Sequence, residues 1–246
     1  MLISGNDNGM IALICVGGFM LVICLLLLLS AFQARKRRKG FAEAAARLGF
    51  AAQAKADVEL LGKVQEVFQR SRVTKVSNVA AKLVGDEHYY LFDVSYTSPS
   101  YSSSPSTSHS SSSQTEYNNV GVLSPHLDLP PFALLSRTKA PGALAGIADN
   151  YFAMAAASAG LKEYREVPTV FQMNYMLFVN DDPRVKDAFT DTMLTQIGMM
   201  EGVLARGSGQ LLVVNNANLR TTGKLDEGKL LEQVNLARQL TDMLVK

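Results

Sequence analysis

An uncharged apolar run near the N-terminus constrains this chain more than any other feature of its sequence. Residues Met10–Phe32 contain no charged side chain, and five cations follow almost at once: Arg35, Lys36, Arg37, Arg38 and Lys39. As a helix, this run extends about 35 Å, enough to cross a hydrocarbon core of about 30 Å with some tilt. A helix also satisfies its own backbone hydrogen bonds, which lipid cannot do. The run therefore predicts one transmembrane helix over residues 10–32, with the lipid bilayer as its partner.

A cleaved signal peptide is the competing interpretation of this run. Such a peptide begins with cations, but residues 1–9 contain no Lys or Arg and one acid, Asp7. Cleavage near residues 30–34 would place Leu29 or Phe32 where the protease needs a small side chain. A lipoprotein anchor fits no better, because neither Cys15 nor Cys24 follows a small residue. We therefore expect the helix to be retained.

The flanking charges predict the orientation of this helix. All the cations of the flank, residues 33–39, lie after the run and none lies before it. The positive-inside rule then places residues 33–246 on the cytoplasmic side and residues 1–9 outside. The five cations are also expected to lie at the membrane surface, where each attracts anionic headgroups by about 1 kcal/mol.

Residues 40–246 form one cytoplasmic domain, and its composition excludes several classes of protein. Of the 24 Lys and Arg, 19 lie in this domain, against 21 of the 22 Asp and Glu, so its net charge is −2. The basic character of the chain therefore belongs to the flank, and we expect no nucleic-acid partner. Both cysteines lie in the apolar run, which excludes a disulfide scaffold or a cysteine-based zinc module in the domain.

Apolar residues at helical spacing predict four helices in this domain. The first continues to Gly49, with one face made by Phe41, Ala45 and Leu48. The second covers Asp57–Arg70, with a face made by Val58, Leu61, Val64 and Phe68. The third opens at Asp182-Pro183, with a buried side made by Val185, Phe189, Met193 and Ile197. The last starts near Asp226, with a stripe made by Leu230, Val234, Ala237, Leu240 and Leu244.

Runs with a two-residue apolar period predict the strands. These are Val73–Val84, Tyr89–Tyr96, Gln114–Leu123, Val170–Val179, Met199–Arg206 and Gln210–Asn216. Turns are expected at Gly85-Asp86 and Gly207-Ser208-Gly209, and the prolines of Leu129–Phe132 favour a bend or a sheet edge. The pattern predicts an α+β fold: a mainly antiparallel sheet with peripheral helices and a C-terminal helix.

A serine-rich tract interrupts the strands. Ser98–Ser113 contains eleven serines in sixteen residues. Such a tract buries too little apolar surface to offset its ordering entropy, so it predicts a disordered loop at a hairpin tip. It is either a tolerated insertion or a target of phosphorylation.

Residues that could carry chemistry are scattered. His88, His109 and His126 have no metal-ligand spacing, and Ser124–Asp128 offers serine, histidine and acid only as chain neighbours, which point apart in an extended chain. Stacking of Tyr89, Tyr90 and Phe92 on bases is a weaker interpretation than core packing.

Phosphate-binding and acidic motifs are equally unspecific. Arg206–Gly209 and Thr221–Lys224 lack the spacing of a phosphate-binding loop. Asp181-Asp182 and Asp226-Glu227 stand at predicted helix starts, where the helix dipole stabilises acids. We therefore assign no catalytic residue, no cofactor and no metal site.

Several short segments mark strands and turns from about residue 41 to the end. They are Leu91-Phe92-Asp93 with Tyr96, Gln114-Thr115, Leu129-Pro130 with Phe132, Phe171 through Leu177, and Asp182-Pro183-Arg184 with Phe189. Together they resemble a family of uncharacterised bacterial proteins with an N-terminal transmembrane helix and a cytoplasmic α+β domain. The resemblance implies a single-pass protein of the bacterial inner membrane, and it carries no catalytic residues with it.

Three hypotheses of function follow. The first is a membrane-anchored interaction or scaffold domain that binds a protein partner. The second is a membrane-tethered enzyme, a hydrolase, whose site is built from dispersed residues such as His126 or His88 with acids. The third is a reader of the lipid surface, which would need a basic face continuous with Arg35–Lys39. The first has the advantage that it requires no catalytic constellation.

Overall fold

A computed structural model of the chain describes residues 7–68, 71–98, 112–137, 156, 160–216 and 226–245. One sheet of nine strands organises this part, in the order β1-β2-β3-β4-β9-β8-β5-β7-β6, and every pairing is antiparallel. The strands are β1 (Ala51–Gln53), β2 (Arg72–Val84), β3 (Glu87–Ser98), β4 (Ser112–Leu123), β5 (Leu129–Ser136), β6 (Lys162–Glu163), β7 (Tyr175–Val179), β8 (Val203–Gly209) and β9 (Leu211–Asn216). The predicted α+β class is confirmed.

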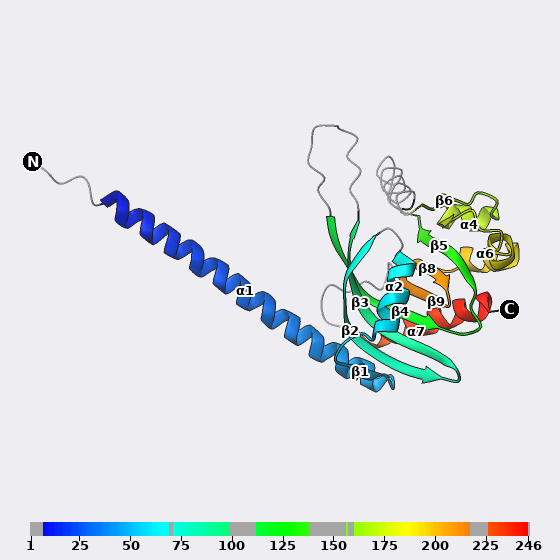
Figure 1. Cartoon of the computed structure of the whole chain (residues 1–246), viewed down its shortest axis with the longest axis horizontal. Coiled ribbons are helices and arrows are strands. Elements are labelled where there is room, and N and C mark those ends of the chain that lie inside the picture. Colours follow the sequence, from blue (N-terminus) through cyan, green and yellow to red (C-terminus); the bar gives the residue numbers. More distant parts are fainter. Residues whose placement is uncertain are drawn as a thin grey trace, which may run out of the picture.

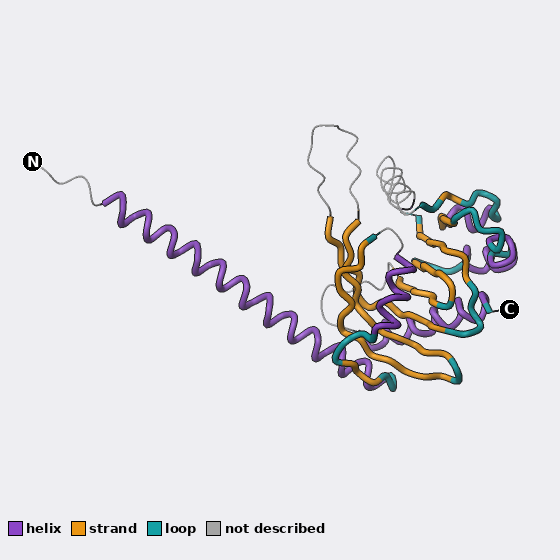
Figure 2. Tube along the Cα trace, in the orientation of Figure 1, coloured by secondary structure: helices purple, strands orange, loops and turns teal. Residues whose placement is uncertain are grey.

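Helices cover both faces of this sheet (Figures 1 and 2). They are α1 (Asp7–Arg47), α2 (Val58–Phe68), α4 (Thr169–Asn174), α5 (Val185–Ala188), α6 (Asp191–Gly198) and α7 (Glu227–Leu244). The last turns of α1 join α4, α5, α6 and α7 over the larger core, where Leu91, Val122 and Leu212 are buried. α2 covers the other face, against Phe92 and Val94.

α1 is one uninterrupted helix that projects from the sheet (Figure 1). The predicted apolar run and the predicted helix ending at Gly49 are therefore one element, about 60 Å long. Gly49, with φ of 79°, reverses the chain after it. Nine large apolar side chains of α1 are at least half exposed: Phe19, Met20, Leu21, Val22, Leu25, Leu26, Leu28, Leu29 and Phe32.

A search of the described residues for helices long and apolar enough to cross a membrane finds none.

The hairpin of β2 and β3 follows the predicted pattern. Gly85, with φ of 65°, makes the turn, and Tyr90, Phe92, Val94 and Tyr96 lie buried on one face. The ladder between β3 and β4 extends to the pair Ser98–Ser112. The predicted loop therefore begins and ends inside strands, and residues 99–111 lie outside the described residues.

The predicted strand Val170–Val179 is wrong over its first half, where the chain forms α4. Pro168 starts the helix, and its carbonyl accepts a hydrogen bond from the Gln172 backbone N–H. Residues four apart share one face of a helix, so the helical turn places Phe171 and Tyr175 together on the core side. The alternating side chains of a strand would place them on one face as well. Met173, expected on the same face, is 65% exposed.

The third predicted helix is two short helices, α5 and α6. The break lies at Phe189-Thr190, because the Thr190 hydroxyl caps α6 by accepting a hydrogen bond from the Met193 backbone N–H. The four side chains predicted to be buried are nevertheless buried. In α2 the predicted face is shifted: Val58 is 89% exposed, and the buried residues are Leu60, Val64, Val67 and Phe68.

The turn of the β8–β9 hairpin lies slightly later than predicted. Gly207 and Ser208 pair with Leu212 and Leu211 in the ladder, and the turn falls at Gly209-Gln210, where Gly209 has φ of 55°. Gly207 is required in the ladder because a Cβ would lie 2.3 Å from the ring of Phe132. Leu129–Phe132 begins β5, which lies between β8 and β7 and so is not an edge strand. Its pairing with β8 shifts register between Leu129 and Phe132, where the two prolines offer no donor.

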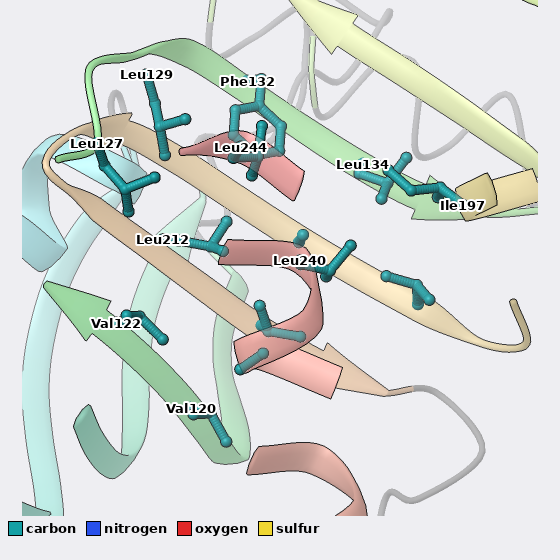
Figure 3. Packing of buried hydrophobic residues seen from close by; sticks show 14 of the residues in the cluster. Val120, Val122, Leu127, Leu129, Phe132, Leu134, Ile197, Leu212, Leu240 and Leu244 are labelled. Carbon is teal, nitrogen blue, oxygen red and sulfur yellow. The ribbon is translucent and has the colours of Figure 1, made fainter. Parts of the chain in front are cut away.

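α7 closes the larger core as predicted (Figure 3). Asp226 caps it by accepting hydrogen bonds from the backbone N–H groups of Gly228 and Lys229. Leu240 and Leu244 pack among Phe132, Leu134 and Leu212 of the sheet. The helix is therefore part of the fold.

Candidate functional site

A buried carboxylate, Asp93 on β3, lies at the junction between α1 and the sheet. Its side chain is 3% exposed. One oxygen accepts a hydrogen bond from the Asn118 backbone N–H at 2.8 Å, and the other accepts one from the Asn78 side-chain amide at 2.7 Å. A buried charge also requires a counter-charge. Arg37 of α1 provides it, with Nη2 at 3.3 Å from both carboxylate oxygens.

Two adjacent irregularities in the sheet build this site. The β2–β3 register shifts between Ser77 and Ala80, and the β3–β4 register shifts between Phe92 and Val94. Asn78 and Asn118 lie at these shifts with φ of 51° and 56°, a left-handed conformation that asparagine tolerates better than other side chains. Both asparagines thereby turn toward Asp93. We call Arg37, Asn78, Asp93, Tyr117 and Asn118 the Asp93 cluster.

Arg37 is held by more than the ion pair. Its guanidinium also donates to the Asn118 side-chain oxygen at 3.1 Å and lies 4.3 Å from the centre of the Tyr117 ring. Its side chain is 18% exposed. Arg37 precedes Phe41 by four residues and Ala44 by seven, so it lies on the buried stripe of α1. This spacing is the sequence signal by which its role could have been found.

The other four cations of the flank are exposed. Arg35, Lys36 and Arg38 form no ion pair with a described residue, and Lys39 lies 3.9 Å from Glu43 one turn later. Of the five residues predicted to face the membrane, Arg37 alone is turned into the domain.

A second ion pair lies on the opposite face of the sheet. Arg206 of β8 lies 2.8 Å from the Glu116 carboxylate, which also accepts a hydrogen bond from the Tyr96 hydroxyl at 2.8 Å. The guanidinium covers the ring of Phe68 at 4.7 Å. Burial and the Glu116 charge raise the pKa of Tyr96. Burial lowers the pKa of Arg206, but the Glu116 charge outweighs it and the pKa is raised overall. Arg206 therefore keeps its charge and the Tyr96 phenol keeps its proton at neutral pH.

Three buried amides join α7 to the sheet beside these clusters. The Asn215 amide donates to the Asn119 side-chain oxygen at 3.1 Å, and the Gln233 amide donates to the Asn215 oxygen at 3.3 Å. The two ion pairs and this chain of amides all involve β4 between Glu116 and Asn119. Buried polar groups satisfied in this way specify one packing of the elements around them.

The residues from Ser124 to Asp128 do not assemble a catalytic triad. The His126 ring lies 2.7 Å from Asp86, and both side chains are exposed. The buried Ser124 hydroxyl accepts from the His126 backbone N–H at 3.2 Å instead of facing the ring. Asp128 pairs with Arg184. Each of the three side chains thus has a different partner.

The remaining sequence candidates are dispersed in the same way. The His88 ring stacks on Tyr90 with 6.1 Å between centroids, whereas His109 lies outside the described residues, as does Thr221–Lys224. Asp182 accepts from the Arg184 backbone and side chain, and these hydrogen bonds lower the pKa of its carboxyl. Within the described ranges, no group of three His, Cys, Asp or Glu side chains could hold a metal ion.

Comparisons with known proteins give one distant structural likeness. No protein-family model and no curated protein matches the sequence. Among solved structures, the chain is similar to the mycobacterial trehalose monomycolate transport factor A, TtfA, with a TM-score of 0.48 and 10% identity. The match covers 85% of this chain and 95% of that one.

Proposed function

We propose that the chain is a membrane-anchored interaction domain that binds a protein partner at the cytoplasmic surface of the inner membrane. Residues 10–32 cross the bilayer, residues 1–9 lie outside, and residues 33–246 lie in the cytoplasm. The observation that carries the proposal is the continuity of α1 from the apolar run into the Asp93 cluster.

The exposed apolar surface of α1 supports the anchor. Phe19–Phe32 presents large apolar side chains around the helix, and a helix of this kind is stable only when a protein core or a membrane covers it. The cations that follow, Arg35–Lys39, suit the headgroup region on the cytoplasmic side.

A rigid connection supports an organising role for the domain. α1 has no break between the apolar run and Phe41, which is 2% exposed in the core. Arg37 fixes the rotation of the helix through Asp93. The angle between the domain and the bilayer is therefore set by the fold, as a scaffold requires, and not by a flexible linker. No described cluster favours a hydrolase over this proposal.

Membrane extraction and crosslinking test the proposal together. The full chain should resist carbonate extraction from membranes, and deletion of residues 10–32 should release it. Photo-crosslinkers placed on the exposed surface of the domain in native membranes should then yield one reproducible protein adduct. Arg37→Ala should change the set of crosslinked positions, whereas Arg38→Ala, which removes an exposed cation, should not. Release of the full chain by carbonate would contradict the anchor, and reproducible absence of adducts would contradict the partner.

A further inference from the structure

We infer that the ends of β2, β3 and β4 that lie away from the β2–β3 turn dock on anionic lipid headgroups beside α1, as a second membrane contact. We call residues 72–77, 94–98 and 112–115 the strand rim. The inference rests on the proposed anchor and adds a surface that the anchor does not require.

Two contacts along α1 establish the direction of the strand rim. Arg37 contacts Asp93, whereas the Leu48 carbonyl near the end of the helix accepts a hydrogen bond from Lys82, which pairs with Tyr89. The N-terminal part of α1 therefore lies on the side of Ser98 at the end of β3, and the C-terminal part of α1 lies on the side of Tyr89. In Figure 1, α1 extends to the left of the domain and the described ends of β3 and β4 point to the top, both away from the β2–β3 turn.

Element lengths place the strand rim at the depth of the membrane surface. Phe32, the last residue of the apolar run, lies five residues or about 7 Å along α1 from Arg37. Ser98 lies five residues or about 16 Å along β3 from Asp93. A strand inclined by as much as about 60° to the helix still brings Ser98 level with Phe32. The strand rim thus reaches the headgroup region on the side of α1 to which the sheet is attached.

The chemistry of the strand rim fits a negatively charged surface. The three segments contain two cations, Arg72 and Lys75, and no acid. Both cations are exposed, and neither forms an ion pair with a described residue. The Thr74 hydroxyl donates to the Ser95 carbonyl, and the Thr115 hydroxyl is hydrogen-bonded to that of Ser95, so these two groups are used within the sheet. The strand rim, together with the exposed cations of α1, therefore attracts anionic lipids through positive charge, and Arg72 and Lys75 are the hydrogen-bond donors that it offers.

The absence of tryptophan from the chain makes a direct test possible, because one introduced tryptophan is the only reporter. The full chain is reconstituted in phosphatidylcholine vesicles with or without phosphatidylglycerol, and nitroxide lipids serve as quenchers. Thr115→Trp reports on the strand rim. Leu83→Trp, at a 61% exposed position beside the opposite β2–β3 turn, is the matched control. Phe19→Trp, with a nitroxide on the acyl chain, reports separately on insertion of α1.

With phosphatidylglycerol present, a headgroup nitroxide should quench the tryptophan at position 115 and not the one at position 83. Reversal of both cations, Arg72→Glu with Lys75→Glu, should weaken this docking by about fivefold for each cation removed, and the quenching should be lost. Arg238→Glu, an exposed α7 cation near Tyr89 at the other end of β3, should leave it unchanged.

The outcomes separate the two proposals. Quenching at position 19 without quenching at position 115 would overturn the strand-rim contact and leave the anchor intact. If the quenching at position 115 depended neither on phosphatidylglycerol nor on the two cation reversals, the recognition of anionic headgroups would be overturned. Failure of quenching at position 19 would overturn the anchor, and the second contact with it.

Discussion

At the scale of single residues, Asp93 imposes the strictest requirement on the fold. Its carboxylate is buried, so removal of its counter-charge is costlier than removal of any exposed ion pair. We predict that Arg37→Ala lowers the free energy of unfolding by about 2–4 kcal/mol. Urea unfolding of the full chain in detergent micelles measures this loss. Arg38→Ala, one position along the helix and exposed, should change stability by less than about 0.5 kcal/mol.

A double-mutant cycle tests whether this loss comes from the pair. Asp93→Asn replaces the buried carboxylate with a neutral amide, so Arg37→Ala should lower the stability of this variant much less than it lowers that of the native chain. The coupling should reach about 1–3 kcal/mol, as for other residues in one polar network. Additive effects would show that Arg37 acts independently of Asp93, through Tyr117 and the hydrogen bond to Asn118.

Buried tyrosines make the stability of the fold depend on pH in the alkaline range. Burial, followed by a hydrogen bond with Glu87, raises the pKa of Tyr89 to about 12. Burial likewise raises the pKa of Tyr90, Tyr96 and Tyr175. The folded protein therefore holds protons that the unfolded chain releases near pH 10. This contribution to stability is complete below about pH 10 and is lost as the pH rises toward 12.

The melting temperature should accordingly fall steeply above about pH 10, together with the rise of phenolate absorbance. Tyr96→Phe should lower the stability at neutral pH, because it removes the hydrogen bond to Glu116, and should make the alkaline loss smaller. A folded protein in which all tyrosines titrate at pH 10 would contradict the assignment.

At the scale of elements, the success of sequence patterns depended on length. α7, with five apolar residues over four turns, and β3, with four apolar residues at two-residue spacing, were predicted correctly because their periodicity repeats several times. The segment 170–179 was assigned wrongly in its first half, because apolar residues two and four apart fit a strand and a helical turn equally well. In the third predicted helix, the four-residue spacing of apolar side chains continues past Thr190. The sequence pattern therefore gave no sign of the break between α5 and α6.

α7 carries the prediction that belongs to this scale. Leu240 is 1% exposed in the larger core, so Leu240→Asp should place a charge there and lower the free energy of unfolding by more than about 4 kcal/mol. Leu231→Asp on the same helix, at a position 46% exposed, should cost less than about 1 kcal/mol. Thermal unfolding followed by circular dichroism compares the two. Equal melting temperatures for Leu240→Asp and the native chain would show that α7 is detachable.

The Asp93 cluster shows what sequence reasoning lacked at the scale of the whole molecule. Arg37 lies 56 residues from Asp93 and 81 from Asn118, and two sheet irregularities bring them together. Bulges leave little trace in a sequence, because the register of a strand pair depends on both strands. The basic flank was therefore treated as one uniform group. Only the stripe of Arg37, Phe41 and Ala44 distinguished one cation from its neighbours.

The flank therefore has two roles, a signal for membrane orientation and the Arg37–Asp93 ion pair. Neutralising all five cations at once would remove both. Neutralising Arg35, Lys36, Arg38 and Lys39 removes most of the topology signal but leaves the Arg37–Asp93 pair intact. We predict that this variant has mixed orientation in the membrane while its domain keeps nearly its native melting temperature. Neutralising Arg37 as well should both scramble the orientation and destabilise the domain.

Labelling of an engineered thiol at the C-terminus measures orientation in intact cells, after Cys15 and Cys24 have been replaced. An impermeant reagent should miss this thiol in the native sequence, because residues 33–246 are proposed to be cytoplasmic. It should label part of the population when four cations are neutralised. Labelling of the native sequence itself would reverse the proposed orientation. Uniform protection of the four-cation variant would instead show that a folded domain held by Arg37 is sufficient to retain the C-terminus inside.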